Sequence, residues 1–365
     1  MKNNFVQKAG ALSNQIQAEV VNQYDGLSAE QVEELVRNQC SLAFSNCVLE
    51  SRLVVEQRIN EFQNEMLGLF YKQPSLVSAL EEPSCVDSFQ RAACTAAKIP
   101  DADGKKMLSE LLGRRFEEPY NRHVASGVNK AIEIVDLITD EELNGLTVFF
   151  AVNYYRPASG QIDEGLTVLD ALYEKLLVQG LPNGDSWIDN LDIHDAVRVS
   201  PLGSLKSLYD WFFELFKGYT VCGIEKDTKQ HEDIVRLLSE EGVPADVLID
   251  HELHSGWVRL KVCNKSDIHG LRIVNNSGGV QESIALTDRQ IDVLDSVFDQ
   301  SNTDGYEKMI KEEFEKKLDG FSNISAVRRW WDGIPSSLRV TVVGKALANA
   351  NARRINQMLP DLELD

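Results

Sequence analysis

Three residues close together, His251, Glu252 and His254, have the side chains that most often bind metal ions. The metalloprotease pattern needs two histidines four residues apart with a glutamate after the first, whereas these histidines are three residues apart. On a helix, that separation would still place both imidazoles on one face for a metal. The spacing nevertheless favours ordinary polar surface, and we expect no metal site and no cofactor.

The sequence contains no established pattern of nucleophilic or phosphate chemistry. It has no Gly-x-Ser-x-Gly motif, no Walker loop and no Rossmann fingerprint. The six cysteines form no Cys-x-x-Cys pair, and none is at zinc-ligand spacing from a histidine, which favours reduced structural thiols. An enzyme is therefore not indicated. A metal-dependent hydrolase or nuclease stays open as an alternative, with a dispersed site that includes His251, Glu252 and His254.

The charge balance argues against general binding to nucleic acids or membranes. The 365 residues include 37 lysines and arginines against 57 aspartates and glutamates, a net charge of −20. Such a chain repels phosphate backbones and anionic lipid headgroups. A local exception is the strand-Gly-helix pattern at the C-terminal end, which resembles part of a winged helix and suggests DNA binding as a second alternative. Its candidate contacts are Arg339, Lys345, Arg353 and Arg354.

The N-terminal segment differs from the rest of the chain in composition. Residues 3–24 carry only two charges, Lys8 and Glu19, and are rich in glutamine and asparagine. Apolar residues alternate at even positions from Ile16 to Val20, which predicts a strand. Because amide side chains form hydrogen-bonded ladders when identical strands stack, we expect self-association here, with pairing inside one chain or a flexible tail as alternatives. The expected self-association residues are Ser13, Gln15, Ile16, Gln17, Ala18 and Val20.

A long helical stripe follows this segment. Ser28 and Gln31 form a capping box, and apolar residues recur at three- and four-residue spacing up to Leu69. One unbroken helix would be about 65 Å long at ~1.5 Å per residue. The sequence therefore predicts either a break near Ser51-Arg52 or a helix that reaches beyond its own domain to a partner.

Further helical stripes and short alternating segments complete the predicted fold. Thr139 with Glu142 and Thr287 with Gln290 cap later helices, whereas 257–262 and 271–274 alternate as strands do. We predict a mainly α protein, a helical bundle or array with an N-terminal β-strand and a small β element in the C-terminal half. The predicted domains are 1–27, a self-association segment; 28–222, a helical domain; and 223–365, an α domain with a minor β element.

Neither a membrane segment nor a secretory signal is expected. The longest apolar stretch, Leu143–Tyr155, is shorter than the ~20 residues of a membrane helix and is expected to form a buried core helix. The first residues lack an apolar signal core, which predicts a cytoplasmic protein.

Both ends of the chain resemble those of one protein family. The opening Gln7-Lys8-Ala9-Gly10-Ala11-Leu12-Ser13-Asn14-Gln15-Ile16-Gln17-Ala18 and the tail segment Val342-Val343-Gly344-Lys345-Ala346-Leu347-Ala348-Asn349-Ala350-Asn351 resemble an uncharacterised bacterial family. Its opening reads Ala-Gly-Asp-Asn-Ser-x-Gln-Ile-Gln-Ala, and here Ala11-Leu12 replaces Asp-Asn. The resemblance implies a cytosolic bacterial protein of mobile-element and phage-defence neighbourhoods, and the opening is similar to short amyloid-like signalling motifs.

Together these features predict an interaction protein rather than an enzyme. We expect a homo-oligomer that assembles through residues 11–24 and the following long helix, with a protein partner from the same locus and a role in anti-phage defence.

Overall fold

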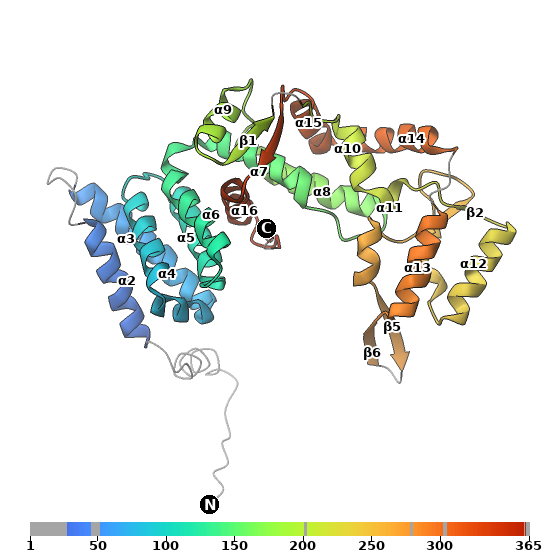
Figure 1. Ribbon diagram of the computed structural model, residues 1–365, viewed down its shortest axis with the longest axis horizontal. Coiled ribbons are helices and arrows are strands. Elements are labelled where there is room, and N and C mark those ends of the chain that lie inside the picture. The colour runs from blue at the N-terminus through green and yellow to red at the C-terminus, as the bar shows by residue number, and fades with distance from the viewer. Residues whose placement is uncertain are drawn as a thin grey trace, which may run out of the picture. The chain divides into compact units, whose positions relative to one another are not determined.

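The chain folds into helices with small β-sheets between them (Figure 1). The computed structural model describes residues 28–44, 52–200, 203–277, 280–301, 305–360 and 362. Across these residues the mainly α class and the small β element predicted from the sequence are confirmed. The expected strand in residues 1–27 lies outside the described residues.

Two compact units make up the described residues, and each combines separate stretches of chain. Unit 1 comprises the described residues up to Phe150 together with Asp185–Ser200 and those from Leu338 onward. Unit 2 comprises Ala151–Gly184 and Pro201–Ser337. The sequence-based division at residues 27 and 222 stays a prediction.

Unit 1 is an array of helices with one two-stranded sheet, β1–β7. Its helices and strands are α2 (Ala29–Phe44), α3 (Arg52–Lys72), η2 (Pro74–Glu81), α4 (Pro83–Ala96), α5 (Ala102–Glu117), α6 (Arg122–Ile134), η3 (Val135–Leu137), α7 (Asp140–Tyr154, whose last turn belongs to unit 2), α9 (Ser186–Ile193), β1 (Val197–Ser200), β7 (Ser337–Val340) and α16 (Val342–Ile355).

The first two helices of unit 1 pack side by side rather than forming one rod. The capping box at α2 is present, because Gln31 N donates to Ser28 Oγ at 3.2 Å and Ser28 N donates to Gln31 Oε1 at 2.7 Å. Helix α3 begins at Arg52 and packs against α2 (Figure 1). Of the two expectations for this stripe, the structure therefore supports the break near Ser51-Arg52, and the helix of about 65 Å is wrong.

Helix α16 lies in the interior of unit 1, where it packs on α5 and α6. Thr341 caps it by accepting a hydrogen bond from Gly344 N at 3.2 Å. A Cβ on Gly344 would lie 2.0 Å from the carbonyl oxygen of Ala196, so only glycine fits there. Small residues along the helix, such as Ala348 and Ala352, are fully buried and allow the neighbouring helices to approach closely.

Helix α7 is the buried core helix expected from the apolar stretch near residue 150. The side chains from Leu146 to Val152 are almost completely buried. Among the residues that the structure describes, this helix and the others are all too short or too polar to cross a bilayer.

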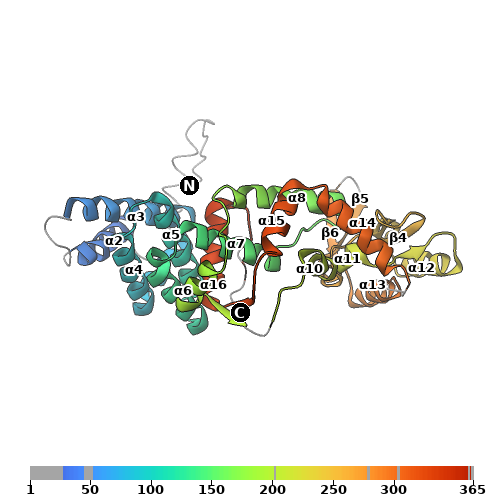
Figure 2. The ribbon, with the colours of Figure 1, turned by 90° about the horizontal axis from the view of Figure 1, so that it is seen from above.

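Unit 2 combines helices with a three-stranded antiparallel sheet in the order β2-β4-β3 and a hairpin, β5–β6. Helices α8 and α15 lie side by side within it (Figure 2). Its helices and strands are α8 (Ile162–Leu177), α10 (Leu208–Leu215), α11 (Lys217–Thr220), β2 (Ile224–Glu225), α12 (Lys229–Glu240), η4 (Ala245–Val247), β3 (Leu248–Asp250), β4 (Trp257–Leu260), η5 (Lys265–Gly270), β5 (Arg272–Ser277), β6 (Val280–Ala285), α13 (Asp288–Gln300), α14 (Glu307–Asp319) and α15 (Ser322–Trp331).

Candidate functional site

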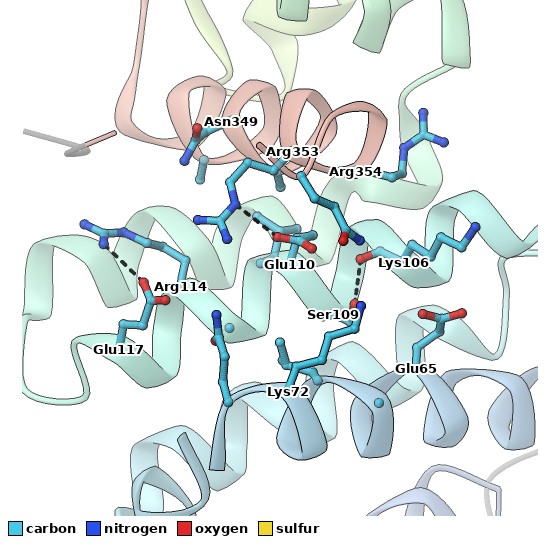
Figure 3. Close-up of a pocket in the computed structure, with 18 residues that line it drawn as sticks. Glu65, Lys72, Lys106, Ser109, Glu110, Arg114, Glu117, Asn349, Arg353 and Arg354 are labelled. Carbon is cyan, nitrogen blue, oxygen red and sulfur yellow. Dashed lines mark hydrogen bonds and ion pairs between the residues drawn. The ribbon is translucent and has the colours of Figure 1, made fainter. Parts of the chain in front are cut away.

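A polar pocket of about 340 Å³ lies in unit 1 between α3, α5 and α16 (Figure 3). We call it the three-helix pocket. Its size is within the range of small-molecule sites. The pocket is lined by Glu65, Gly68, Leu69, Lys72, Gln73, Lys106, Ser109, Glu110, Leu111, Gly113, Arg114, Glu117, Ala346, Asn349, Ala350, Arg353, Arg354 and Gln357.

Two buried cationic side chains of α5 connect this helix to neighbouring segments. Lys105 of α5 is fully buried, and its Nζ donates to Glu61 of α3 at 2.6 Å. This hydrogen bond lowers the pKa of the Glu61 carboxyl. On the next turns of α5, the buried Arg115 donates to the carbonyl oxygen of Pro119 and to Ser84 Oγ, at 2.9 and 2.8 Å. The wall formed by α5 is therefore fixed before any ligand arrives.

Cations outnumber acids in the lining of the pocket. The cations are Lys72, Lys106, Arg114, Arg353 and Arg354, and the acids are Glu65, Glu110 and Glu117. Two further carboxylates pair with these cations from outside the lining, because Glu118 contacts Arg114 and Asp103 contacts Arg354 at 2.5 Å. Five cationic side chains gathered in one cavity of a chain with net charge −20 still mark a place where an anion can bind, since low-dielectric walls concentrate the field of nearby charges.

Arg353 and Glu110 face each other across the middle of the pocket (Figure 3). Arg353 Nε lies 3.3 Å from Glu110 Oε2, and about four-fifths of each side chain is shielded from solvent. Arg354 forms an ion pair with Asp103 at 2.5 Å and donates to Asn351 Oδ1 at 2.8 Å. The arginines are thus oriented by carboxylate and amide partners from their own unit.

Among the side chains that line the pocket, no nucleophile is paired with a histidine base. Ser109 Oγ donates to the carbonyl oxygen of Lys106 at 2.8 Å, and no histidine is part of the lining. Nucleophilic catalysis needs a hydroxyl or thiol beside a base.

The structure divides the four cations proposed from the sequence for DNA contact. Arg353 and Arg354 line the three-helix pocket, whereas Arg339 is exposed on β7 and Lys345 is half-buried on α16; neither lines the pocket. The self-association residues Ser13, Gln15, Ile16, Gln17, Ala18 and Val20 lie outside the described residues.

His251 and His254 lie in the turn between β3 and β4 and are both buried, so the expectation of ordinary polar surface is wrong, and the helical face considered for a metal is not formed. Both rings are buried against backbone carbonyls: His251 Nε2 lies 2.8 Å from Val221 O, and His254 Nδ1 lies 2.9 Å from Cys222 O. His251 Nδ1 accepts a hydrogen bond from Leu253 N, so the ring is neutral with its proton on Nε2. Burial lowers the pKa of His251 to about 4.

Glu252, the third member of that sequence cluster, binds an arginine instead of a metal. It forms an ion pair with the buried Arg259 at 2.8 Å and accepts a hydrogen bond from Ile162 N, at the start of α8. The described part of the chain contains no group of three or more His, Cys, Asp or Glu side chains that could hold a metal ion.

The described cysteines are free thiols, and most of them are buried. Burial raises the pKa of Cys40 and of Cys263 to about 12. Because the thiolate is the reactive form, these two groups are poor nucleophiles at neutral pH.

Sequence reasoning missed Lys72, Lys106 and Arg114, although the sequence held a signal for the last two. Within Ala102–Glu117, the pairs Lys105-Lys106 and Arg114-Arg115 concentrate cations in a strongly acidic chain. These residues line one pocket with Arg353, which comes from the other end of the chain, and only the tertiary fold brings them together.

Comparison with known proteins gives one match. A protein-family model whose description assigns no activity matches residues 26–364. No curated protein and no solved structure matches the chain.

Proposed function

The chain belongs to the family whose model spans residues 26–364, and we propose that it is an interaction protein that binds a small anionic ligand in the three-helix pocket. One observation carries the proposal: five cations and three acids line a cavity of about 340 Å³ in a chain of net charge −20. On an acidic protein, a cavity where cationic side chains gather directs anions to one place.

The roles of the lining residues follow from their positions. Arg353 presents a guanidinium fork, which binds oxyanions through two parallel hydrogen bonds, and Glu110 orients it. Lys72, in the last turn of α3, supplies an exposed ammonium from the opposite wall. Ser109 and Asn349 add polar groups to the lining.

Isothermal titration calorimetry of the full chain with inorganic phosphate tests this proposal. The wild-type protein is expected to bind one phosphate per chain. Lys72→Met should weaken binding at least about fivefold, because a charged hydrogen-bond donor is worth about 1 kcal/mol or more. Lys308→Met is the matched control, since Lys308 lies on α14 of unit 2 with its side chain 92% exposed.

Two results would contradict the proposal. One is the absence of saturable phosphate binding by the wild-type chain. The other is equal weakening by Lys72→Met and Lys308→Met, because that would indicate a general effect of surface charge rather than a site.

A second proposed function, self-association, depends on the N-terminal segment. Residues 3–24 carry only two charges, so the repulsion that a net charge of −20 imposes on two chains is weakest there. We propose that chains assemble through residues 11–24. Mass photometry should show oligomers for the full chain and monomers for a chain that lacks residues 1–24. Equal, monomeric masses would refute it.

The resemblance of both ends of the chain to a phage-defence-associated family supports a third proposal, a cytoplasmic role in anti-phage defence. Phage should form fewer plaques on bacteria that express the full chain with its neighbouring genes than on bacteria that express the version without residues 1–24. Equal plaque numbers in the two strains and in a strain without these genes would exclude this role.

A further inference from the structure

The three-helix pocket is larger than an inorganic anion requires. Its volume of about 340 Å³ lies in the range of sites that enclose small organic molecules, whereas a phosphate group has only five non-hydrogen atoms. We infer that the natural ligand is an organic phosphate of about nucleotide size, an inference that rests on the proposed anion-binding function.

Two cations from different helices, Lys72 of α3 and Arg353 of α16, suit a phosphate monoester. Such a group carries about −1.5 to −2 charges at neutral pH, whereas a carboxylate carries a single charge. A phosphate also has three terminal oxygens, enough to accept hydrogen bonds from Arg353 and Lys72 at the same time.

The remaining space lies beside small residues. An added Cβ on Gly68 would meet no atom within 4 Å, although Gly68 is in the interior of α3. On α16, the lining residues Ala346 and Ala350 are also small, whereas the place beside Gly113 on α5 is taken by the Leu69 side chain. Because glycine inside a helix costs about 1 kcal/mol relative to alanine, the open position at Gly68 is not explained by helix stability. It provides room for the organic part of the ligand.

Calorimetry with paired ligands tests this assignment on the full chain. The ligands are inorganic phosphate, adenosine monophosphate, uridine monophosphate and ribose 5-phosphate, with adenosine as the uncharged control. At least one organic phosphate should bind about tenfold more tightly than inorganic phosphate, a difference of about 1.4 kcal/mol in binding free energy. Adenosine should not bind measurably.

The variant Gly68→Leu distinguishes the contribution of the organic part to the affinity from that of the phosphate. The leucine would fill the space beside α3, so the organic phosphate should bind no better than inorganic phosphate, whose own affinity should change less than about twofold. Asn64→Leu is the matched control, because Asn64 is exposed on the same helix and does not line the pocket. It should leave both affinities unchanged.

The outcomes distinguish this inference from the function on which it rests. If inorganic phosphate binds but no organic phosphate binds more tightly, the inference is wrong and anion binding stands. The same holds if Gly68→Leu weakens both ligand types equally or neither. If no phosphate binds the wild-type chain, both proposals fail.

Discussion

Arg259 is a fully buried charge that connects several segments of unit 2. Its guanidinium donates to the carbonyl oxygen of Gly160 at 2.8 Å, to that of Leu260 at 3.0 Å and to both oxygens of Glu252 at 3.0 Å. Burial lowers its pKa, and the contact with Glu252 opposes this shift. Because each nitrogen of the guanidinium donates to an acceptor within the protein, this residue has a structural role.

Removing this charge should destabilise unit 2 strongly. Arg259→Met leaves the Glu252 carboxylate and the Gly160 carbonyl without their donor, so we expect the free energy of unfolding to fall by about 3–5 kcal/mol. Urea denaturation, monitored by tryptophan fluorescence, measures this change in the free energy of unfolding. Arg236→Met is the control, because its ion pair with Asp233 is largely exposed and is worth at most about 1 kcal/mol. A loss as small as that of the control would contradict the role assigned to Arg259.

His251 should make stability depend on pH in a defined window. Its pKa is about 4 in the folded chain because of burial, against 6.5 ordinarily. Above pH 6.5 the ring is neutral in both states. As the pH falls from 6.5 to 4, only the unfolded chain takes up the proton, so stability falls by about 3 kcal/mol at 1.36 kcal/mol per pKa unit.

His251→Gln tests this window, because glutamine can still donate to Val221 O but does not titrate. The unfolding free energy of the wild-type protein should drop more steeply between pH 6.5 and 4 than that of the variant. Parallel pH profiles would show that His251 is not responsible.

At the scale of elements, two helical glycines have opposite surroundings. Gly68 in α3 faces open space, whereas a Cβ on Gly344 in α16 would lie 2.0 Å from the Ala196 backbone oxygen. We therefore expect Gly68→Ala to raise the free energy of unfolding by about 0.5–1 kcal/mol through helix propensity. Gly344→Ala should lower it, because α16 or β1 must shift. Thermal denaturation of both variants checks the pair, and effects of the same sign would be inconsistent with these environments.

Local patterns predicted many elements correctly. The capping boxes of Ser28 and Thr287 are present as expected, and the alternation around Trp257 forms β4. Each of these signals involves residues only a few positions apart, and the backbone conformation that they favour is the one found. The expectation of polar surface for His251 and His254 failed because both rings contact backbone carbonyls of a distant segment, which local spacing does not reveal.

At the scale of the whole molecule, the candidate site could not be read from the sequence. Arg353 was singled out for DNA contact, but its neighbours Glu110 and Lys72 come from distant parts of the chain. Only packing of α3, α5 and α16 brings them together, and neither periodicity nor local charge encodes which helices meet. The net charge of −20 is the useful global signal, because it makes the gathering of five cationic side chains in one cavity unusual.

Hydrogen–deuterium exchange of the full chain, with saturating inorganic phosphate against chloride at equal ionic strength, tests anion binding most directly. Binding stabilises the segments that contact the ligand, whereas a general salt effect protects all amides alike. We expect slower exchange in residues 65–73, 106–117 and 346–357, with unit 2 as the internal reference. Unchanged exchange in all three segments, or equal protection throughout both units, would contradict it.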